Sequence, residues 1–216
     1  MLTPSSSGFR YWPILLGILW LAVIVWGLRI IWKYEITAGS SGAAPAQWPK
    51  DSRIPRALDH ATLVMLAHPR CPCTRASVDE LAWLMTRLQG RLQAHVIFYQ
   101  PADQSDTWSE TSLWRAAASI SGVNVWRDKG SIEADRFRAK TSGHVVLYDP
   151  EGRLLFSGGI TGLRGHVGDN VGRRAIVSLL TQGKADNARM PVLGCTLKGP
   201  TLAVGGRENE RPIHGN

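Results

Sequence analysis

The chain has 216 residues, enough for one globular domain with accessory segments, and its 44% hydrophobic and 19% charged residues exclude general disorder. The formal net charge of +8 suggests an anionic membrane surface or nucleic acid. The basic residues are scattered, however, and form no nucleic-acid recognition signature, so we expect no nucleic-acid partner.

The N-terminal part of the chain predicts a membrane-spanning helix. No charged residue occurs from Tyr11 to Leu28, and apolar residues resume after Arg29. About 20 such residues cross a bilayer core as a helix. We therefore expect a short N-terminal segment at residues 1–11, followed by a transmembrane helix at residues 12–33.

A cleaved signal peptide is the alternative interpretation of this segment. Its apolar region would be shorter, about 7–15 residues, and a small-x-small cleavage site would follow promptly. Charged residues follow first here, and Ala44-Pro45-Ala46 lies far downstream, which favours an uncleaved anchor. Arg10 competes with Arg29 and Lys33 for the cytoplasmic side, so the positive-inside rule leaves the orientation open.

The rest of the chain divides by composition. Residues 34–57 are rich in Gly, Ser, Ala and Pro, which predicts a flexible tether. Residues 58–185 alternate strand and helix patterns and form the expected domain. Residues 186–216 have little periodicity, which predicts a tail that runs over the surface.

The domain pattern predicts the order β-α-β-α-β-β-α. Strands are predicted from short runs of apolar and β-branched residues, and helices from apolar residues three and four positions apart. This order gives an α/β fold with parallel strands joined by helices, closed by a hairpin and a last helix. The expected strands are Ala61–Ala67, His95–Tyr99, Val123–Trp126, Val145–Tyr148 and Leu154–Ser157, and the expected helices are Ser77–Leu88, Thr111–Ile120 and Asp169–Leu180, with a helical turn at Ile132–Arg138.

The chain has three cysteines, too few for a disulfide-stapled scaffold, and two of them begin the first long helix. A helix N-terminus presents unpaired N–H groups and a partial positive charge, which lower the pKa of a thiol such as Cys71 or Cys73. Arg70 and Arg75 add positive charge on either side, and Pro72 costs nothing in a first helical turn. We therefore expect a reactive pair in preference to inert or structural cysteines.

The segment His68-Pro69-Arg70-Cys71-Pro72-Cys73-Thr74 resembles the active-site turn of thioredoxin-like oxidoreductases, whose usual motif has two residues between the cysteines. With the Gly-rich residues 157–173 and Pro191-Val192-Leu193-Gly194-Cys195, it is similar to the RedB-like thioredoxin-fold proteins over roughly residues 60–197. This resemblance implies a thioredoxin-like domain anchored in a bacterial inner membrane, on the periplasmic side. It also implies that the partners are protein thiols or disulfides.

The resemblance leaves two assignments of the catalytic residues. In one, the Cys71 thiolate attacks a disulfide and Cys73 resolves the mixed disulfide. In the other, Thr74 takes the second position of the motif and hydrogen-bonds the Cys71 thiolate. Cys71 is the nucleophile in both, and His166 is a candidate proton donor or acceptor. No organic cofactor is implied.

Two departures from the thioredoxin pattern change the expected chemistry. A disulfide between cysteines two positions apart is strained and easier to reduce, which favours an oxidant or isomerase role. Thioredoxins carry a cis-proline before the hairpin strand, where this chain has Thr141-Ser142-Gly143-His144. We expect this edge to dock substrates differently and to be more open to a metal.

The alternative function is a copper-binding metallochaperone of the Sco type, which shares this fold. Thiolate sulfur and imidazole nitrogen suit Cu(I) or zinc, and the single-residue cysteine spacing is uncommon for zinc, so copper is favoured. A purely structural cysteine pair on a membrane-bound domain is the third possibility. The candidate ligands are His68, Cys71, Cys73, His144, His166 and Cys195.

The Gly-rich segment and Cys195 each have more than one possible interpretation. The glycines between Gly158 and Gly172 predict positive φ angles and close backbone approach. They fit a loop over the cysteine pocket, an anion site at a helix start, or a turn-rich cap. Cys195 either returns to the pocket, to resolve Cys71 or complete a metal site, or packs under the tail.

Overall fold

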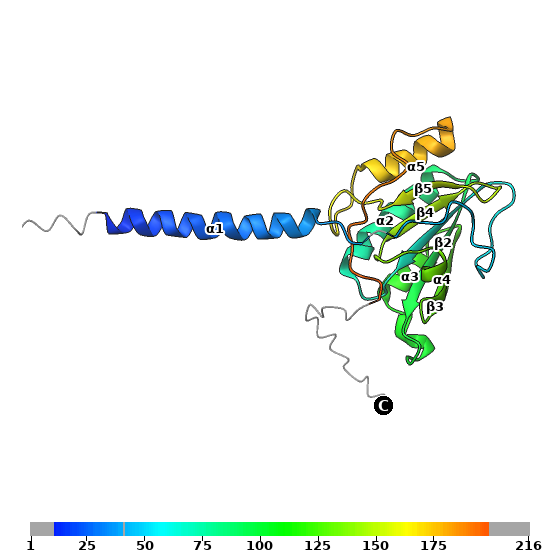
Figure 1. Ribbon diagram of the computed structural model, residues 1–216, viewed down its shortest axis with the longest axis horizontal. Helices are drawn as coiled ribbons and strands as arrows, with labels where there is room; N and C mark the ends of the chain where they lie inside the picture. The colour runs from blue at the N-terminus through cyan, green and yellow to red at the C-terminus, as the bar shows by residue number, and fades with distance from the viewer. Residues whose placement is uncertain (1–10, 41, 199–216) are drawn as a thin grey trace, which may run out of the picture. The chain divides into compact units, whose positions relative to one another are not determined.

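The computed structural model describes residues 11–40 and 42–198, in two units that divide between Thr37 and Ala38. The first unit contains α1 (Trp12–Ile36), a helix of 25 residues and therefore about 37 Å long (Figure 1). An 18-residue window within this helix has a mean hydropathy of 2.5, so the helix is long and apolar enough to cross a membrane, a property that signal sequences share. The apolar helix expected in this region is confirmed.

The second unit is built on a five-stranded sheet in the order β3-β2-β1-β4-β5. β1 (Ala61–Ala67) pairs in parallel with β2 (Leu92–Gln100), and β2 pairs in parallel with β3 (Val123–Lys129). β4 (His144–Tyr148) runs antiparallel to β1, and β5 (Leu154–Gly158) runs antiparallel to β4. The predicted parallel strands closed by a hairpin are therefore confirmed.

The helices follow the predicted order, with one short addition. Each expected helix is present with bounds shifted by a few residues, and the helical turn before β4 forms a short helix of its own. The start of the first domain helix is set by Pro72, because proline is favoured at the first helical position. The helices are α2 (Pro72–Arg87), α3 (Ser112–Ala118), α4 (Ile132–Arg136) and α5 (Val171–Gln182), with the 3-10 helix η2 (Asp106–Ser109).

Both faces of the central strand are buried, which explains the continuous apolar sequence of β1. Leu63 and Met65 face a core shared with α2, α3 and α5, whereas Val64 and Leu66 face a second core that includes residues of α4. Helices thus cover both faces of the sheet (Figure 1). This packing fixes the carboxyl end of β1, where the chain turns into α2 and carries Cys71.

The segment at residues 34–57 was expected to be a flexible tether, but α1 extends to Ile36 and the chain contacts the domain from Gly39 onward, where the Gly39 N–H donates to the carbonyl of Val192 at 2.8 Å. Ile54 is 3% exposed in the second core. The ring of Trp48 meets Phe137 and Tyr148 edge-on, with centroids 5.2 Å apart in both pairs. Composition predicted flexibility because small residues and proline dominate the segment, but its few large apolar side chains find partners in the folded domain.

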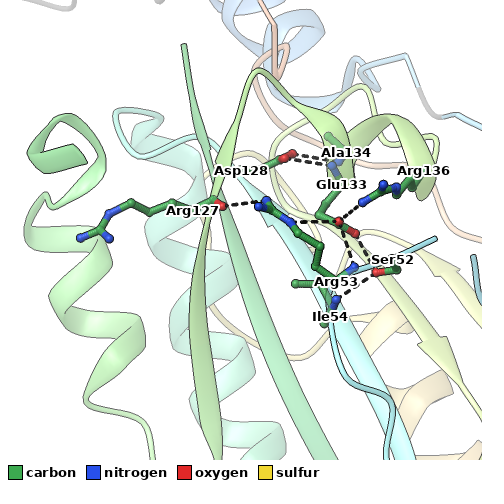
Figure 2. Close-up of polar contacts among 8 residues, drawn as sticks. All are labelled: Ser52, Arg53, Ile54, Arg127, Asp128, Glu133, Ala134 and Arg136. Carbon is green, nitrogen blue, oxygen red and sulfur yellow. Dashed lines mark hydrogen bonds and ion pairs between the residues drawn. The ribbon is translucent and has the colours of Figure 1, made fainter. Parts of the chain in front are cut away.

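A buried carboxylate helps to hold this segment (Figure 2). Glu133, whose side chain is 1% exposed, accepts hydrogen bonds from Ser52 Oγ at 2.7 Å and from the Arg53 backbone N–H at 3.1 Å. It also pairs with the guanidinium of Arg136. Asp128 accepts hydrogen bonds from two backbone N–H groups at the start of α4, each at 2.9 Å, and so positions Glu133.

The end of the described chain also lies against the domain, where a surface tail was expected at residues 186–216. The backbone N–H of Met190 donates to the carbonyl of Ser157 in β5 at 3.0 Å, and Leu197 is 1% exposed in the second core. The expectation of a surface tail therefore does not hold up to residue 198. Residues 199–216 lie outside the described residues.

Candidate functional site

Cys71 occupies the junction between β1 and α2. It is the N-cap residue of α2, with extended backbone angles of φ −89° and ψ 114°, and it is 2% exposed. The unpaired N–H groups of the first helical turn converge at such a position and favour negative charge on the sulfur. The structure therefore places Cys71 where the sequence analysis expected a nucleophile.

Three thiols meet at this junction. Cys71 Sγ lies 2.9 Å from Cys195 Sγ, and these two atoms and Cys73 Sγ all lie within 4.8 Å of one another. All three are free cysteines, with Cys73 buried and Cys195 half-buried. Of the two interpretations of Cys195, the structure thus supports its return to the pocket.

Hydrogen bonds among the thiols set their ionisation. Contact with the Cys195 thiol, and then with Cys73, lowers the pKa of Cys71 far below its ordinary value, against burial and with help from the Thr74 hydroxyl. The hydrogen bonds with Cys71 and Cys73 raise the pKa of Cys195. Contact with Cys195 would lower the pKa of Cys73, but its hydrogen bond with Cys71 and burial outweigh this and raise it. These shifts favour the thiolate form at Cys71, with the thiols of Cys195 and Cys73 as its hydrogen-bonding partners.

The arginines contribute less than the sequence analysis expected. The largest causes of the lowered pKa of Cys71 are the neighbouring thiols, not Arg70 or Arg75. The guanidinium of Arg70 lies over the ring of Trp108, 4.7 Å from its centroid. The sequence left the return of Cys195 to the pocket as one of two possibilities, because Cys195 is 124 positions away from Cys71.

Ser142 connects the segments that surround the thiols. Its Oγ lies 2.6 Å from Thr74 Oγ1 and accepts a hydrogen bond from the His68 backbone N–H at 2.7 Å. Its own backbone N–H donates to the carbonyl of Cys195 at 2.8 Å. Ser142 lies in the segment that replaces the cis-proline of thioredoxins, and its role could not be predicted because a serine in a loop carries no specific signal.

The edge at residues 140–142 is covered, although the sequence analysis expected it to be open. The backbone N–H of Leu197 donates to the carbonyl of Lys140 at 2.9 Å, and the neighbouring residues form an antiparallel bridge. A Cβ atom at Gly194 would lie 2.1 Å from the carbonyl oxygen of Ser142, so this approach requires a glycine. The chain thus adds its own short segment to this edge.

The Gly-rich segment lies beside the thiols. A Cβ atom at Gly165, whose φ is +68°, would lie 3.9 Å from Cys73 Cα. Arg164 Nη1 donates to the carbonyl of Gly194 at 2.7 Å and so connects this segment to the one that carries Cys195. These contacts support the interpretation as a loop at the cysteine pocket.

A buried ion pair holds the far end of this loop on α2. Glu80, which is 0% exposed, accepts a hydrogen bond from the Gly168 backbone N–H at 2.6 Å and pairs with Arg173 at 2.8 Å. The side chain of Asn170 caps α5 by accepting from the Arg173 backbone N–H at 2.8 Å. The anion site considered at this helix start therefore competes with a side-chain cap.

The candidate histidine ligands do not belong to the thiol group, which among the described residues contains the three cysteines alone. The buried ring of His68 packs against two aromatic rings, and its Nδ1 accepts from the Arg70 backbone N–H at 3.1 Å. His166 is exposed, with Nδ1 2.8 Å from the carbonyl of Arg164. His144 is buried, with Nε2 2.9 Å from Ser157 Oγ.

Comparison with solved structures gives the fold. The domain is similar to an uncharacterized conserved protein from Geobacillus kaustophilus, with 18% identity, a TM-score of 0.55, and coverage of 77% of this chain and 95% of that one. It is also similar to a hypothetical protein from Sinorhizobium meliloti, with 24% identity, a TM-score of 0.52, and coverage of 77% and 96%.

A putative thioredoxin from Neisseria meningitidis has 16% identity and a TM-score of 0.45 over 68% of this chain and 94% of that one. No protein-family model and no curated protein matches the chain. The sheet order, the parallel β1–β2–β3 pairing and the antiparallel β4–β5 hairpin give the second unit a thioredoxin-like α/β fold.

Proposed function

We propose that this protein is a membrane-anchored thiol–disulfide oxidoreductase of the RedB-like thioredoxin-fold type, with Cys71 as its nucleophile. One observation carries the proposal. Cys71 is a buried thiol at the start of α2, and hydrogen bonds from two further thiols lower its pKa. The thiolate is the form of cysteine that attacks disulfides, so this environment suits exchange chemistry at neutral pH.

The reaction begins when the thiolate of Cys71, the first cysteine of the Cys-Pro-Cys motif, attacks one sulfur of a disulfide in a partner protein. The old S–S bond breaks, a new bond forms to Cys71, and the released substrate sulfur leaves as a thiolate that takes up a proton. The hydroxyl of Thr74 and the start of α2 stabilise the attacking charge. His166, on the exposed loop beside the pocket, is the proposed proton carrier for the leaving sulfur. The reaction requires no organic cofactor.

The proposed location follows from α1 and from the chemistry. We assign α1 as a single-pass anchor in a bacterial inner membrane, with the domain on the periplasmic side. Disulfides form and persist in that compartment, which supplies protein thiols and disulfides as partners.

The second candidate function is Cu(I) binding by a Sco-like metallochaperone. Its support is the grouping of three Sγ atoms within 4.8 Å of one another. Thiolates are soft ligands that suit Cu(I). Because His68 and His166 lie outside this group, the copper site would consist of sulfur ligands alone, from Cys71, Cys73 and Cys195.

A redox titration of the full chain in detergent micelles tests the proposal. The protein is equilibrated at defined ratios of reduced to oxidised glutathione, its thiols are alkylated, and the products are mapped by mass spectrometry. We expect a reversible two-electron couple that includes Cys71 and is lost in Cys71→Ser. If no couple is found and Cu(I) alone protects the thiols from alkylation, the copper function replaces the redox function.

A further inference from the structure

We infer that Cys195, and not Cys73, is the thiol that resolves the mixed disulfide on Cys71. The inference rests on the proposed function and names a further catalytic residue for it. The resolving step requires a second sulfur that can reach Cys71 Sγ while Cys71 is bound to its substrate. Two cysteines are candidates, and they differ in how the fold presents them.

Cys73 is poorly placed for a bond to Cys71. It lies two positions after Cys71, the N-cap residue of α2, so a bond between the two sulfurs would close a small ring with only Pro72 between the cysteines. A disulfide also requires a specific Cβ–S–S–Cβ torsion and a limited Cα separation. To reach that geometry, the backbone of the first helical turn would have to change, and this turn carries the hydroxyl of Thr74 that stabilises the thiolate.

Cys195 is presented differently, because it comes from a separate segment. Its Sγ is already 2.9 Å from Cys71 Sγ. A bond to Cys195 leaves the backbone of α2 unchanged, since the segment that carries Cys195 pairs with the edge at residues 140–142 and not with the helix. The resting structure thus brings this sulfur to its target before any substrate arrives.

The position of Cys195 is fixed by contacts on both sides. Its carbonyl accepts from the Ser142 N–H at 2.8 Å, and two residues later the Leu197 N–H donates to the carbonyl of Lys140 at 2.9 Å. On the other side, Arg164 donates to the carbonyl of Gly194 at 2.7 Å. These bonds on either side of the half-buried Cys195 hold its backbone at a place from which its sulfur contacts Cys71 Sγ.

The two steps balance. The Cys71 thiolate attacks a substrate disulfide, forms Cys71–S–S–R and expels the other substrate sulfur as R′S⁻. The Cys195 thiol loses its proton to this thiolate, and its sulfur attacks Cys71 Sγ and expels RS⁻. The products are a Cys71–Cys195 disulfide and a substrate reduced by two electrons. Cys73 keeps its thiol throughout and acts as a positioning residue that donates a hydrogen bond to the Cys71 thiolate.

Dithiobis(nitrobenzoate), an aromatic disulfide whose released thiol is coloured, separates the two steps. The reduced full chain in detergent micelles is mixed with one equivalent of the reagent. Attack by Cys71 releases the first coloured thiol, and resolution of the mixed disulfide releases the second. We expect wild type and Cys73→Ser to release both and to end with a Cys71–Cys195 disulfide, mapped by mass spectrometry. Cys195→Ser is expected to release one and to keep the other on Cys71.

A second variant keeps all three thiols and guards against a folding defect in Cys195→Ser. In Gly194→Ala the added Cβ would lie 2.1 Å from the carbonyl of Ser142, which displaces the segment. In this variant we expect the ratio of the second to the first rate of coloured-thiol release to fall at least tenfold below that of wild type. Gly162→Ala is the matched control, because its Cβ would make an ordinary 3.7 Å contact, and it should keep the wild-type ratio of the two rates.

The outcomes separate the two hypotheses. If Cys195→Ser releases both coloured thiols, or if Cys73→Ser stops after the first, the assignment of Cys195 is overturned while the proposed function stands. If wild type releases no more colour than Cys71→Ser, Cys71 is not a nucleophile toward disulfides, and the proposed function fails together with this inference.

Discussion

The backbone N–H of Ser142 donates a hydrogen bond to the carbonyl of Cys195 at 2.8 Å, and this bond joins the end of the described chain to the turn before β4. The side chain of the same serine contacts Thr74 in the first turn of α2. The environment of Cys71 is therefore assembled from three segments that are distant in sequence.

The ionisation of Cys71 is expected to depend more on Cys195 than on Cys73. The pKa of Cys71 lies below its ordinary value of 9.0, so its thiolate persists as the pH falls into the neutral range. Because contact with Cys195 is the largest cause, Cys195→Ala should raise this pKa more than Cys73→Ala does. The pH dependence of the ultraviolet thiolate absorbance of each variant measures the change. Equal effects of the two variants would contradict the ranking.

Thr74 is expected to support the thiolate through its hydroxyl. Thr74→Val removes the group that lies 2.6 Å from Ser142 Oγ and that helps to lower the pKa of Cys71. We expect a higher pKa of Cys71, slower attack on a disulfide, and a loss of about 1–3 kcal/mol in the free energy of unfolding.

Thr74→Ser is the control for this prediction, since it restores the hydroxyl and should recover most of the reaction rate. If Thr74→Val raises neither the pKa of Cys71 nor the activation barrier but still destabilises the fold, the hydroxyl is purely structural. Pseudo-first-order rates with dithiobis(nitrobenzoate) and urea unfolding provide the two measurements.

Glu133 is expected to be the main polar anchor of the segment that follows α1. Glu133→Ala leaves the hydroxyl of Ser52 and the guanidinium of Arg136 without their buried acceptor. Losing the buried acceptor of these hydrogen bonds costs about 1–3 kcal/mol. Urea unfolding of the full chain in detergent micelles should show this loss.

Glu110→Ala is the matched control for Glu133→Ala. Glu110 also pairs with an arginine, Arg127, but both side chains are more than a third exposed. A surface pair contributes at most about 1 kcal/mol, so the control should remain close to wild type. Similar losses in the two variants would show that burial of Glu133 is not the cause.

Acid is expected to destabilise the domain through buried histidines. Burial lowers the pKa of His144 to about 4, from 6.5 in an exposed side chain. The pKa of His95 is also lowered to about 4, and burial is the largest cause. Between these values the unfolded chain binds protons that the folded chain does not. The free energy of unfolding therefore falls as the pH falls from 6.5 to 4, by about 1.4 kcal/mol per pH unit for each histidine.

The variant His144→Gln tests this prediction, because it removes one titrating group while an amide can still reach Ser157 Oγ. The slope of the unfolding free energy against pH should decrease in that range. The same substitution at His60, whose side chain is 31% exposed, is the control. An unchanged slope in His144→Gln would contradict the assignment.

The order of strands and helices could be predicted because it depends on local patterns. The buried strand Ala61–Ala67 has the same bounds in the sequence-based prediction and in the structure, and its apolar sequence reflects burial on two faces. Residues 42–57 and 186–198 were predicted poorly, because small residues and proline dominate them. These two segments take a defined structure because a few scattered side chains, such as Trp48, Ile54 and Leu197, pack against the folded sheet.

Local sequence patterns were enough to place Cys71 at the start of a helix after a buried strand, since they specify both elements and the proline that follows. They also placed an apolar helix of membrane-spanning length before the domain. That Cys195 contacts Cys71, and that His68 and His166 lie outside the thiol group, became clear from the folded structure alone. Contacts between segments 124 positions apart depend on backbone pairing and on close approach at Gly194, and no local pattern in the sequence encodes such a meeting.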